Sequence, residues 1–452
     1  MLGNNELRSA VREVLPGVRA DLEALVRIPS VAGDPSLRVA AELTSTLLRA
    51  AGMPDVRVLD DVAGGAPAVL GRFPAPPGMP TVLLYAHYDV QPAGDLADWT
   101  SEPFTPDERA GRLYGRGCAD DKAGIAAHLA ALRAFGGTPP VGVTVLVEGE
   151  EEIGSPTLGA FLARYRDELT ADVIVLADSD NIAAGTPTFT TSLRGVAACV
   201  VELRALERAG HSGSFGGAVP DALTALCRLL ATLHDDRGNV AVEGLTSAEP
   251  PEYDYPEARL RAEAGMLDGV ELIGEGTLAE RLWTRPAATV LAIDSVRITA
   301  AANALAPVAS AKVGLRVAPG DDARSVRAAL AAHLRAHVPW GLQITVTEAD
   351  AGDPYAIDAT GPHYAAARRA FAAAYGADVV DVGQGGTIPF IAAFAAEYPE
   401  ATILVISVGA DPDSRPHSTD ESLHLGDFAH ACLAEALLLS ELAAAPPGSD
   451  NR

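Results

Sequence analysis

Four short apolar runs constrain the fold of this chain most strongly. They lie at residues 81–86, 143–148, 172–177 and 402–409, and turn-forming residues bound each of them. Apolar runs of this length are typical of buried strands. Alanine-rich segments with helical spacing lie between them, notably at residues 121–135. The alternation predicts an α/β fold, with a mostly parallel sheet that carries helices on both faces.

The middle of the chain has a different pattern. Strands are predicted at residues 196–205, 289–299, 310–319 and 342–350, and helices at 220–233 and 323–338. The resulting order, β-α-β-β-α-β, is that of the ferredoxin-like split unit. We therefore expect residues 191–352 to form a small α+β domain, inserted into a larger domain that residues 1–190 and 353–452 build together.

Histidine and carboxylate side chains follow all four strands predicted for the larger domain. Ligands bind beyond the carboxyl ends of parallel strands, because loops and helix N-termini converge there. The residues in question are His87 and Asp89, the glutamates between Glu148 and Glu152, Asp178 and Asp180, and Asp411, Asp413 and His417. Asp120 is expected at the same edge, since a glycine-rich loop places it just before the helix predicted at 121–135.

Imidazoles and carboxylates without cysteine are the ligand set of zinc or manganese. Two histidines and several carboxylates exceed what one tetrahedral ion needs, which favours two ions that share a bridging carboxylate. Each piece alone has an ordinary explanation: a hydrogen-bonded turn for His87 and Asp89, a solvated loop for the glutamates, and a helix N-cap for Asp120. Their convergence at one edge of the sheet favours a metal centre.

The charge of the chain argues against two classes of partner. The 452 residues carry a formal net charge of -26, so nucleic acid and anionic membrane surfaces are disfavoured. The four cysteines are far apart and form no CxxC pair, which fits a reducing compartment. The N-terminus lacks the apolar core of a signal peptide, and no run approaches the length of a spanning helix. We expect a cytoplasmic protein.

Seven segments of the chain resemble one known family. They read YAHYDVQP, YGRGCADDKAG, EEIGSP, DSDN, GHSGSFGGAVPDAL, GQGGTIPF and RPHSTDE, and they run from Tyr85 to Glu421 in the family's order. As a set they resemble the zinc-dependent metallopeptidases that include carnosine-type and other dipeptidases, aminoacylase, acetylornithine deacetylase, succinyl-diaminopimelate desuccinylase and carboxypeptidase G. SDN followed by LRG and HSGSFGGAV is most similar to the dipeptidase branch.

The resemblance implies a role for each residue of the metal centre. It implies that His87 and Asp180 bind one metal ion, that Glu152 and His417 bind the other, and that Asp120 bridges them. Asp89 would orient His87, as a carboxylate commonly does for a metal-bound imidazole. Glu151 would be the general base that takes a proton from the attacking water and passes it to the leaving amine. The peptide between Asp120 and Asp121 is expected to be cis.

The resemblance also gives the inserted domain a function as a lid and a homodimerisation surface. His211 would reach into the partner's active site and stabilise the oxyanion, whereas the residues alone favour a capping or turn histidine in a glycine-rich loop. Arg316 is expected to bind the substrate carboxylate, with an ordinary surface arginine as the alternative. Asn303 and the turn Gly385, Gly386 and Thr387 are the other substrate-binding candidates.

The sequence thus predicts a homodimeric metallopeptidase with two divalent metal ions, zinc with manganese or cobalt as alternatives. It would cleave an amide bond next to a free carboxylate, in the first instance in dipeptides. The alternative substrate is an N-acyl amino acid, because the same centre serves both reactions. A binding protein that has lost the chemistry would lack a ligand or the base, and every one of them is present in this sequence.

Overall fold

The computed structural model describes residues 3–60, 62–386 and 389–444, which fold into two compact units. The first unit consists of Met1–Thr191, Asp358–Asp381 and Pro389–Arg452, and the second begins at Ser192 and continues to Ile357. The second unit also includes the described residues from Val382 to Gly386, which sequence analysis had assigned to the larger domain.

The first unit is built on one large sheet with the strand order β1-β2-β6-β3-β7-β17-β8. Its strands are β1 (Asp55–Leu59), β2 (Ala68–Phe73), β3 (Thr81–His87), β6 (Gly142–Glu148), β7 (Val173–Ser179), β8 (Thr188–Leu193) and β17 (Thr402–Ser407). The central strands β6, β3, β7 and β17 are parallel, and the outer pairings are antiparallel. The prediction of a mostly parallel α/β sheet is confirmed, and all four predicted strands are present.

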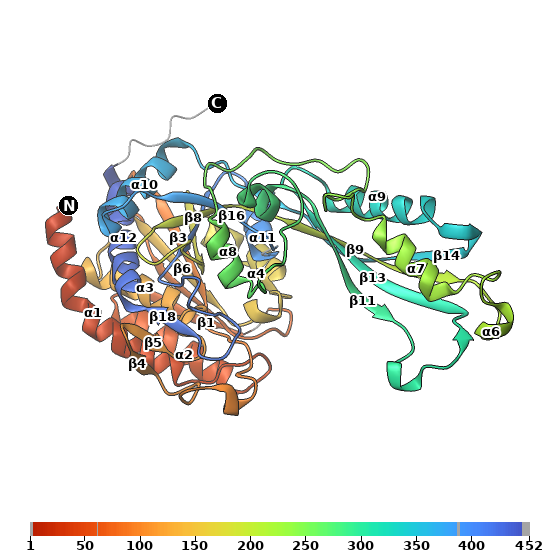
Figure 1. Cartoon of the computed structure of the whole chain (residues 1–452). Coiled ribbons are helices and arrows are strands. Elements are labelled where there is room, and N and C mark those ends of the chain that lie inside the picture. The colour runs from red at the N-terminus through yellow and green to blue at the C-terminus, as the bar shows by residue number, and fades with distance from the viewer. Residues whose placement is uncertain (1–2, 61, 387–388, 445–452) are drawn as a thin grey trace. The chain divides into compact units, whose positions relative to one another are not determined.

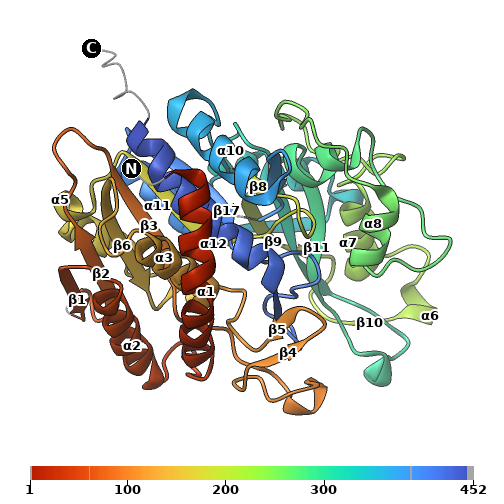
Figure 2. The same ribbon diagram turned by 90° about the vertical axis from the view of Figure 1, so that its left-hand side faces the viewer.

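Helices cover both faces of this sheet. They are α1 (Asn4–Val26), α2 (Ser36–Ala50), α3 (Lys122–Ala134), α4 (Leu158–Arg164), α5 (Arg166–Leu169), α10 (Gly361–Tyr375), α11 (Pro389–Glu397) and α12 (Leu425–Ala444). Helices α1, α3 and α12 pack side by side in one layer (Figure 2). Helix α11 lies on the other side of the sheet (Figure 1). Its Phe390 and Phe394 pack against the ring of Tyr85 from β3.

The sequence of helix α3 explains where the helix begins and how closely it packs. Asp121 precedes it and accepts a hydrogen bond from the backbone N–H of Gly124, which is the usual N-cap contact. The helix is almost entirely buried, and its alanines permit close packing between the sheet, α1 and α12. Gly136 and Gly137 follow its last turn with φ angles of 61° and 76°, which L side chains adopt rarely.

A small antiparallel sheet joins two segments that are about 300 residues apart in the sequence. It consists of β4 (Asp107–Arg109), β5 (Arg112–Tyr114) and β18 (Ser422–His424), in the order β18-β5-β4. Ser422 is paired with Tyr114, so the loop that precedes β18 lies beside the loop that follows β5. This pairing brings the segment with His417 next to the segment with Asp120.

The second unit has the predicted ferredoxin-like order. Its sheet, β11-β13-β9-β14, consists of β9 (Gly195–Arg204), β11 (Ala287–Asp294), β13 (Val308–Val317) and β14 (Gln343–Gly352). Helices α7 (Ala222–Ala231) and α9 (Ala323–Ala336) bury one face of the sheet in a single apolar core. The other regular elements are β10 (Gly210–His211), α6 (Ser212–Phe215), α8 (Glu257–Glu263), β12 (Ala304–Leu305) and β15 (Tyr355–Ala356). Strand β16 (Val380–Gln384) crosses the boundary between the units.

Within the described residues, no helix combines the length and the apolar character that a membrane span requires.

Candidate metal centre

Two groups of potential metal ligands lie at the carboxyl end of the parallel strands. One consists of His87, Glu151 and Asp178, and the other of Asp120, Glu152 and His417. In each group the ligand atoms lie within 4.8 Å of one another. His87 is the last residue of β3 and Asp178 the sixth of β7, its parallel neighbour, so the sheet itself brings them together.

Asp120 stands between the two groups. Its Oδ1 lies 3.0 Å from Nε2 of His87, and its Oδ2 lies 3.0 Å from Nε2 of His417. Nε2 of His417 is also 3.0 Å from Oε2 of Glu152. One carboxylate thus presents a different oxygen to each imidazole. The Asp120–Asp121 peptide is cis, as the resemblance implies.

Asp89 is fully buried and contacts both His87 and the glutamate turn. Nδ1 of His87 lies 3.0 Å from the backbone oxygen of Asp89 and 3.3 Å from its Oδ1. The two carboxylate oxygens accept hydrogen bonds from the backbone N–H groups of Glu151 and Glu152, at 3.2 and 3.0 Å. Asp89 therefore positions the imidazole of His87. It also positions the turn at Glu151 and Glu152, which supplies one carboxylate to each group.

Asp178, and not Asp180, lies in the group with His87. Oδ2 of Asp178 is 3.9 Å from Nε2 of His87. Asp180 follows the end of β7 and is in neither group. Burial, and then the charges of Asp120 and Asp411, raise the pKa of Asp180 to about 7. The two acids are two residues apart in the sequence, and Asp178 is the one in the group with His87.

Two residues that sequence analysis did not single out hold the ligands in place. The backbone N–H of Gln91 donates to Oε1 of Glu152 at 3.1 Å, and its side-chain amide donates to Oε2 at 3.0 Å. Glu421 accepts hydrogen bonds from the backbone N–H groups of Gly117, Ala119 and Asp120, at 2.9 to 3.2 Å. Both lie inside the motifs quoted above, but residue type alone gives no sign of these contacts.

The remaining acids of the glutamate run have structural partners. Oε1 of Glu148 is buried and accepts hydrogen bonds from the hydroxyls of Tyr85 and Ser155. Glu150 accepts from the backbone N–H of Ala66 and from the hydroxyl of Thr157. These contacts assign to the fold the two glutamates that the sequence left without a role.

Burial, neighbouring charges and hydrogen bonds shift the pKa of three acids in the centre. Burial, and then the charges of Asp120, Glu152 and Asp89, raise the pKa of Glu151 to about 7. Burial and the charge of Asp120 also raise the pKa of Asp178. Although burial opposes it, hydrogen bonds with His417 and His87 hold the pKa of Asp120 below its ordinary value. Since buried like charges are costly, a bound cation would relieve this crowding.

The donor set therefore fits two divalent ions. It offers two imidazoles and four carboxylates, without a thiolate, and places one carboxylate between the two groups. Oxygen and nitrogen donors of this kind suit zinc, manganese and cobalt.

The substrate-binding candidates lie in the second unit. His211 is exposed in β10, and its Nδ1 accepts a hydrogen bond from the backbone N–H of Gly213, a turn contact. Asn303 is nearby, because its backbone oxygen accepts from the N–H of Ser212. Arg316 is exposed in β13, and Gly385 and Gly386 follow β16. Thr387 lies outside the described residues.

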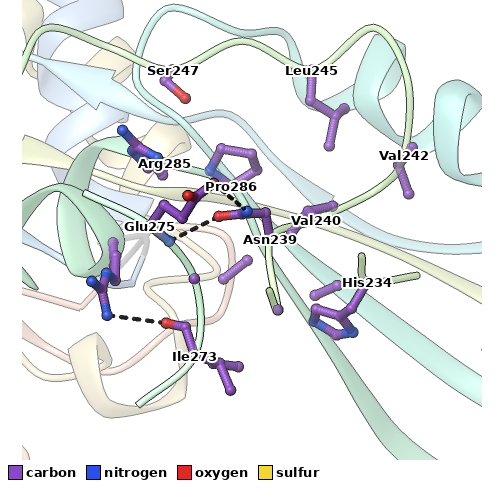
Figure 3. A pocket seen from close by; sticks show the side chains of 15 residues that line it. His234, Asn239, Val240, Val242, Leu245, Ser247, Ile273, Glu275, Arg285 and Pro286 are labelled. Carbon is purple, nitrogen blue, oxygen red and sulfur yellow. Dashed lines mark hydrogen bonds between the residues drawn. The ribbon is translucent and has the colours of Figure 1, made fainter. Parts of the chain in front are cut away.

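A cavity of about 330 Å³ in the second unit has a different character. As Figure 3 shows, Asn239 and Glu275 exchange hydrogen bonds in it. Arg281 donates to the backbone oxygen of Ile273. Most of the other lining side chains are apolar, among them Val240, Val242, Leu245, Pro286 and Ala288. Several of its polar groups bind one another, and neither of the two groups of potential metal ligands found among the described residues lies in this cavity.

Comparison with known proteins shows the family of this chain. The profile of the peptidase family M20/M25/M40 matches residues 83–441. The chain belongs to this peptidase family. All six ligand candidates and the buried Asp89 lie inside the matched segment.

Relatives of this M20 chain are named as dipeptidases. A cysteinylglycine-S-conjugate dipeptidase of Corynebacterium striatum is 39% identical over 368 residues, which cover 80% of each chain. A beta-Ala-His dipeptidase of Rattus norvegicus is 27% identical and covers 93% of this chain and 88% of its own length. Among solved structures, human carnosine dipeptidase 1 has a TM-score of 0.76 at 23% identity, covering 98% of this chain and 99% of its own, which shows a shared fold.

Proposed function

We propose that this protein is a di-metal dipeptidase that hydrolyses the amide bond next to the free carboxylate of a small peptide. The position of Asp120 carries the proposal, because its two oxygens face His87 and His417, and Glu151 lies beside the first group. The names of the relatives from Corynebacterium striatum and Rattus norvegicus support a dipeptide as substrate.

In this proposal, His87 and Asp178 hold one divalent ion, Glu152 and His417 hold the other, and Asp120 contacts both. Asp178 takes the position that the resemblance assigned to Asp180. When bound, the ions lower the pKa of water and stabilise negative charge on the substrate carbonyl. Zinc is the metal we propose, with manganese and cobalt as alternatives. A site with these donors accepts all three metals, and their availability decides which one is bound.

Glu151 is the proposed general base. Its Oε2 is 4.0 Å from Nε2 of His87, and it is not part of the group around His417. In this role its carboxylate accepts a proton from the attacking water and returns it to the leaving amine. Asp89 fixes the backbone of Glu151, so the base is held at its place in the turn.

The second unit completes the proposed site in a homodimer. An exposed apolar stretch supports the dimer, since the residues Val290, Leu291, Ile293, Val296 and Ile298 are all exposed, Ile298 to 94%. His211 is exposed as well and would act on the partner's substrate, with Asn303 beside it. Arg316 and the glycines 385 and 386 would bind the substrate carboxylate. The four cysteines are free, as expected of a protein from the cytoplasm.

A substrate panel tests the proposal. The purified protein is assayed with dipeptides and with N-acyl amino acids that have the same C-terminal residue. Bound metal is measured in the same sample. Hydrolysis of the dipeptides with about two divalent ions per chain is the expected result. Turnover restricted to N-acyl amino acids would replace the dipeptidase by an amidohydrolase, and the absence of both turnover and metal would indicate a non-catalytic homologue.

A further inference from the structure

Arg194 is a nearly buried cation that the mechanism above does not use. It precedes β9 and is 8% exposed. Its Nη1 donates to the backbone oxygens of Arg281 and Arg285, at 3.2 and 3.4 Å. Its Nε is buried and has no hydrogen-bond partner. One edge of the guanidinium is thus tied to the backbone, while the edge formed by Nε and Nη2 has no partner among the described residues.

A second guanidinium, that of Arg316, lies close enough to act on the charge of Arg194. Arg316 on β13 is paired with Val196 on β9, and Arg194 is two residues before Val196, just ahead of the strand. No carboxylate lies within 4 Å of either guanidinium in the described part of the chain. Burial, and then the charge of Arg316, lower the pKa of Arg194 to about 10. Two uncompensated cations are unusual in a chain with 60 acidic and 34 basic residues.

The glycine turn after β16 is shaped around Arg194. A Cβ atom at position 385 would lie 2.9 Å from Nη2 of Arg194, closer than real Cβ contacts. A Cβ atom at position 386 would meet nothing within 4 Å. The backbone therefore approaches the free edge of the guanidinium at Gly385 and leaves open space at Gly386. All of these residues belong to the second unit.

We infer that Arg194 is a second carboxylate-binding residue, whose Nε and Nη2 receive the C-terminal carboxylate of the substrate in a pair of parallel hydrogen bonds, next to Arg316 and Gly385. The fork of a guanidinium matches the two oxygens of a carboxylate, and burial strengthens the attraction. The inference rests on the proposed function for its location at the substrate and defines the substrate class as molecules that end in a free carboxylate.

Binding measurements test this inference without turnover. Glycylglycine, its C-terminal amide and N-acetylglycine are titrated calorimetrically into metal-loaded protein that carries Glu151→Gln, alone or with Arg194→Gln. We expect Arg194→Gln to weaken binding of the two carboxylate ligands on the order of 10- to 100-fold and binding of the amide less than about 3-fold. If Arg194→Gln fails to fold, Arg194→Lys is used in its place. It keeps the charge but loses the fork, so its loss of affinity for the two carboxylate ligands should be intermediate.

Arg327→Gln is the matched control, because Arg327 also donates to a backbone oxygen, that of Ala349, in the same unit. It should leave all three affinities unchanged. Equal weakening of acid and amide by Arg194→Gln, or unchanged binding of the acids, would overturn the inference and leave Arg194 with a structural role. If N-acetylglycine alone binds, the dipeptidase proposal fails while the carboxylate inference is still tested.

Discussion

Glu151 and Glu152 are neighbours in the chain, but their carboxylates belong to different groups. The carboxylate of Glu151 lies with His87 and Asp178, and that of Glu152 lies with Asp120 and His417. Both backbone N–H groups donate to Asp89, so one buried carboxylate fixes the turn that separates them. Adjacent acids can therefore serve different purposes, one as a base and the other as a ligand.

Because the two carboxylates lie in different groups, substitutions at Glu151 and at Glu152 should cause different defects. Glu151→Gln should lower kcat by about 10²- to 10⁴-fold and retain both metal ions, because only the proton acceptor is lost. Glu152→Gln should lower the metal content toward one ion per chain, because one ligand is weakened. Activity and metal content are measured on the same preparations. Normal turnover of Glu151→Gln would contradict its role as the base.

Asp178 and Asp180 can be separated in the same way. Asp178→Asn should weaken binding of one metal ion by about 10-fold or more, because its carboxylate is the one grouped with His87. Asp180→Asn should affect binding less. Competition with a chromophoric chelator gives the affinities of both variants. The reverse order would restore the assignment that the resemblance implies.

Removal of the metal should abolish activity reversibly. We expect dialysis against a strong chelator to eliminate turnover and to lower the Tm, because the crowded acids of the centre lose the cations that compensate them. Addition of zinc, manganese or cobalt should restore both quantities. Differential scanning calorimetry and activity assays follow the cycle. Full activity after complete removal of metal would contradict the di-metal proposal.

Glu148 should make the stability of the metal-free protein depend on pH. Burial raises its pKa from 4.5 to about 7, so between these values the folded state keeps a proton that the unfolded state has lost. The contribution of Glu148 to stability is therefore highest below pH 4.5 and falls by on the order of 3 kcal/mol as the pH rises to about 7. Glu148→Gln should remove this decline, whereas the exposed Glu13→Gln should not. Chemical unfolding at several pH values measures the difference, and identical profiles for Glu148→Gln and the unmodified protein would refute it.

Mixed dimers test whether His211 acts on the partner. His211→Ala and Glu151→Gln should each be nearly inactive as pure proteins. If each site combines its own Glu151 with the partner's His211, a randomly reassociated equal mixture should regain about a quarter of the unmodified activity. Unfolding and refolding the two variants together provides the mixture, and each variant refolded alone is the control. No recovery would argue against a shared site.

Much of the fold could be predicted because it depends on local patterns. The apolar runs at β3, β6, β7 and β17 bury both faces of a parallel sheet, and the β-α-β-β-α-β order of the second unit follows from strand and helix spacing. The segment 382–386 could not be assigned to the second unit, because nothing in its composition records which strand it joins.

The sequence by itself determined the chemical inventory of the site, because strand ends rich in histidine and carboxylate converge in any parallel sheet with this order of elements. Only the tertiary structure shows that Asp178 lies in the group with His87 and Asp180 does not, and it alone shows the contacts of Gln91 and Glu421 and the free edge of Arg194. The contacts of Glu421, for example, depend on the pairing of β18 with β5, and the position of Asp178 depends on the course of β7 beside β3. Contacts between residues far apart in the chain leave no periodic trace in the sequence, so only the folded chain shows them.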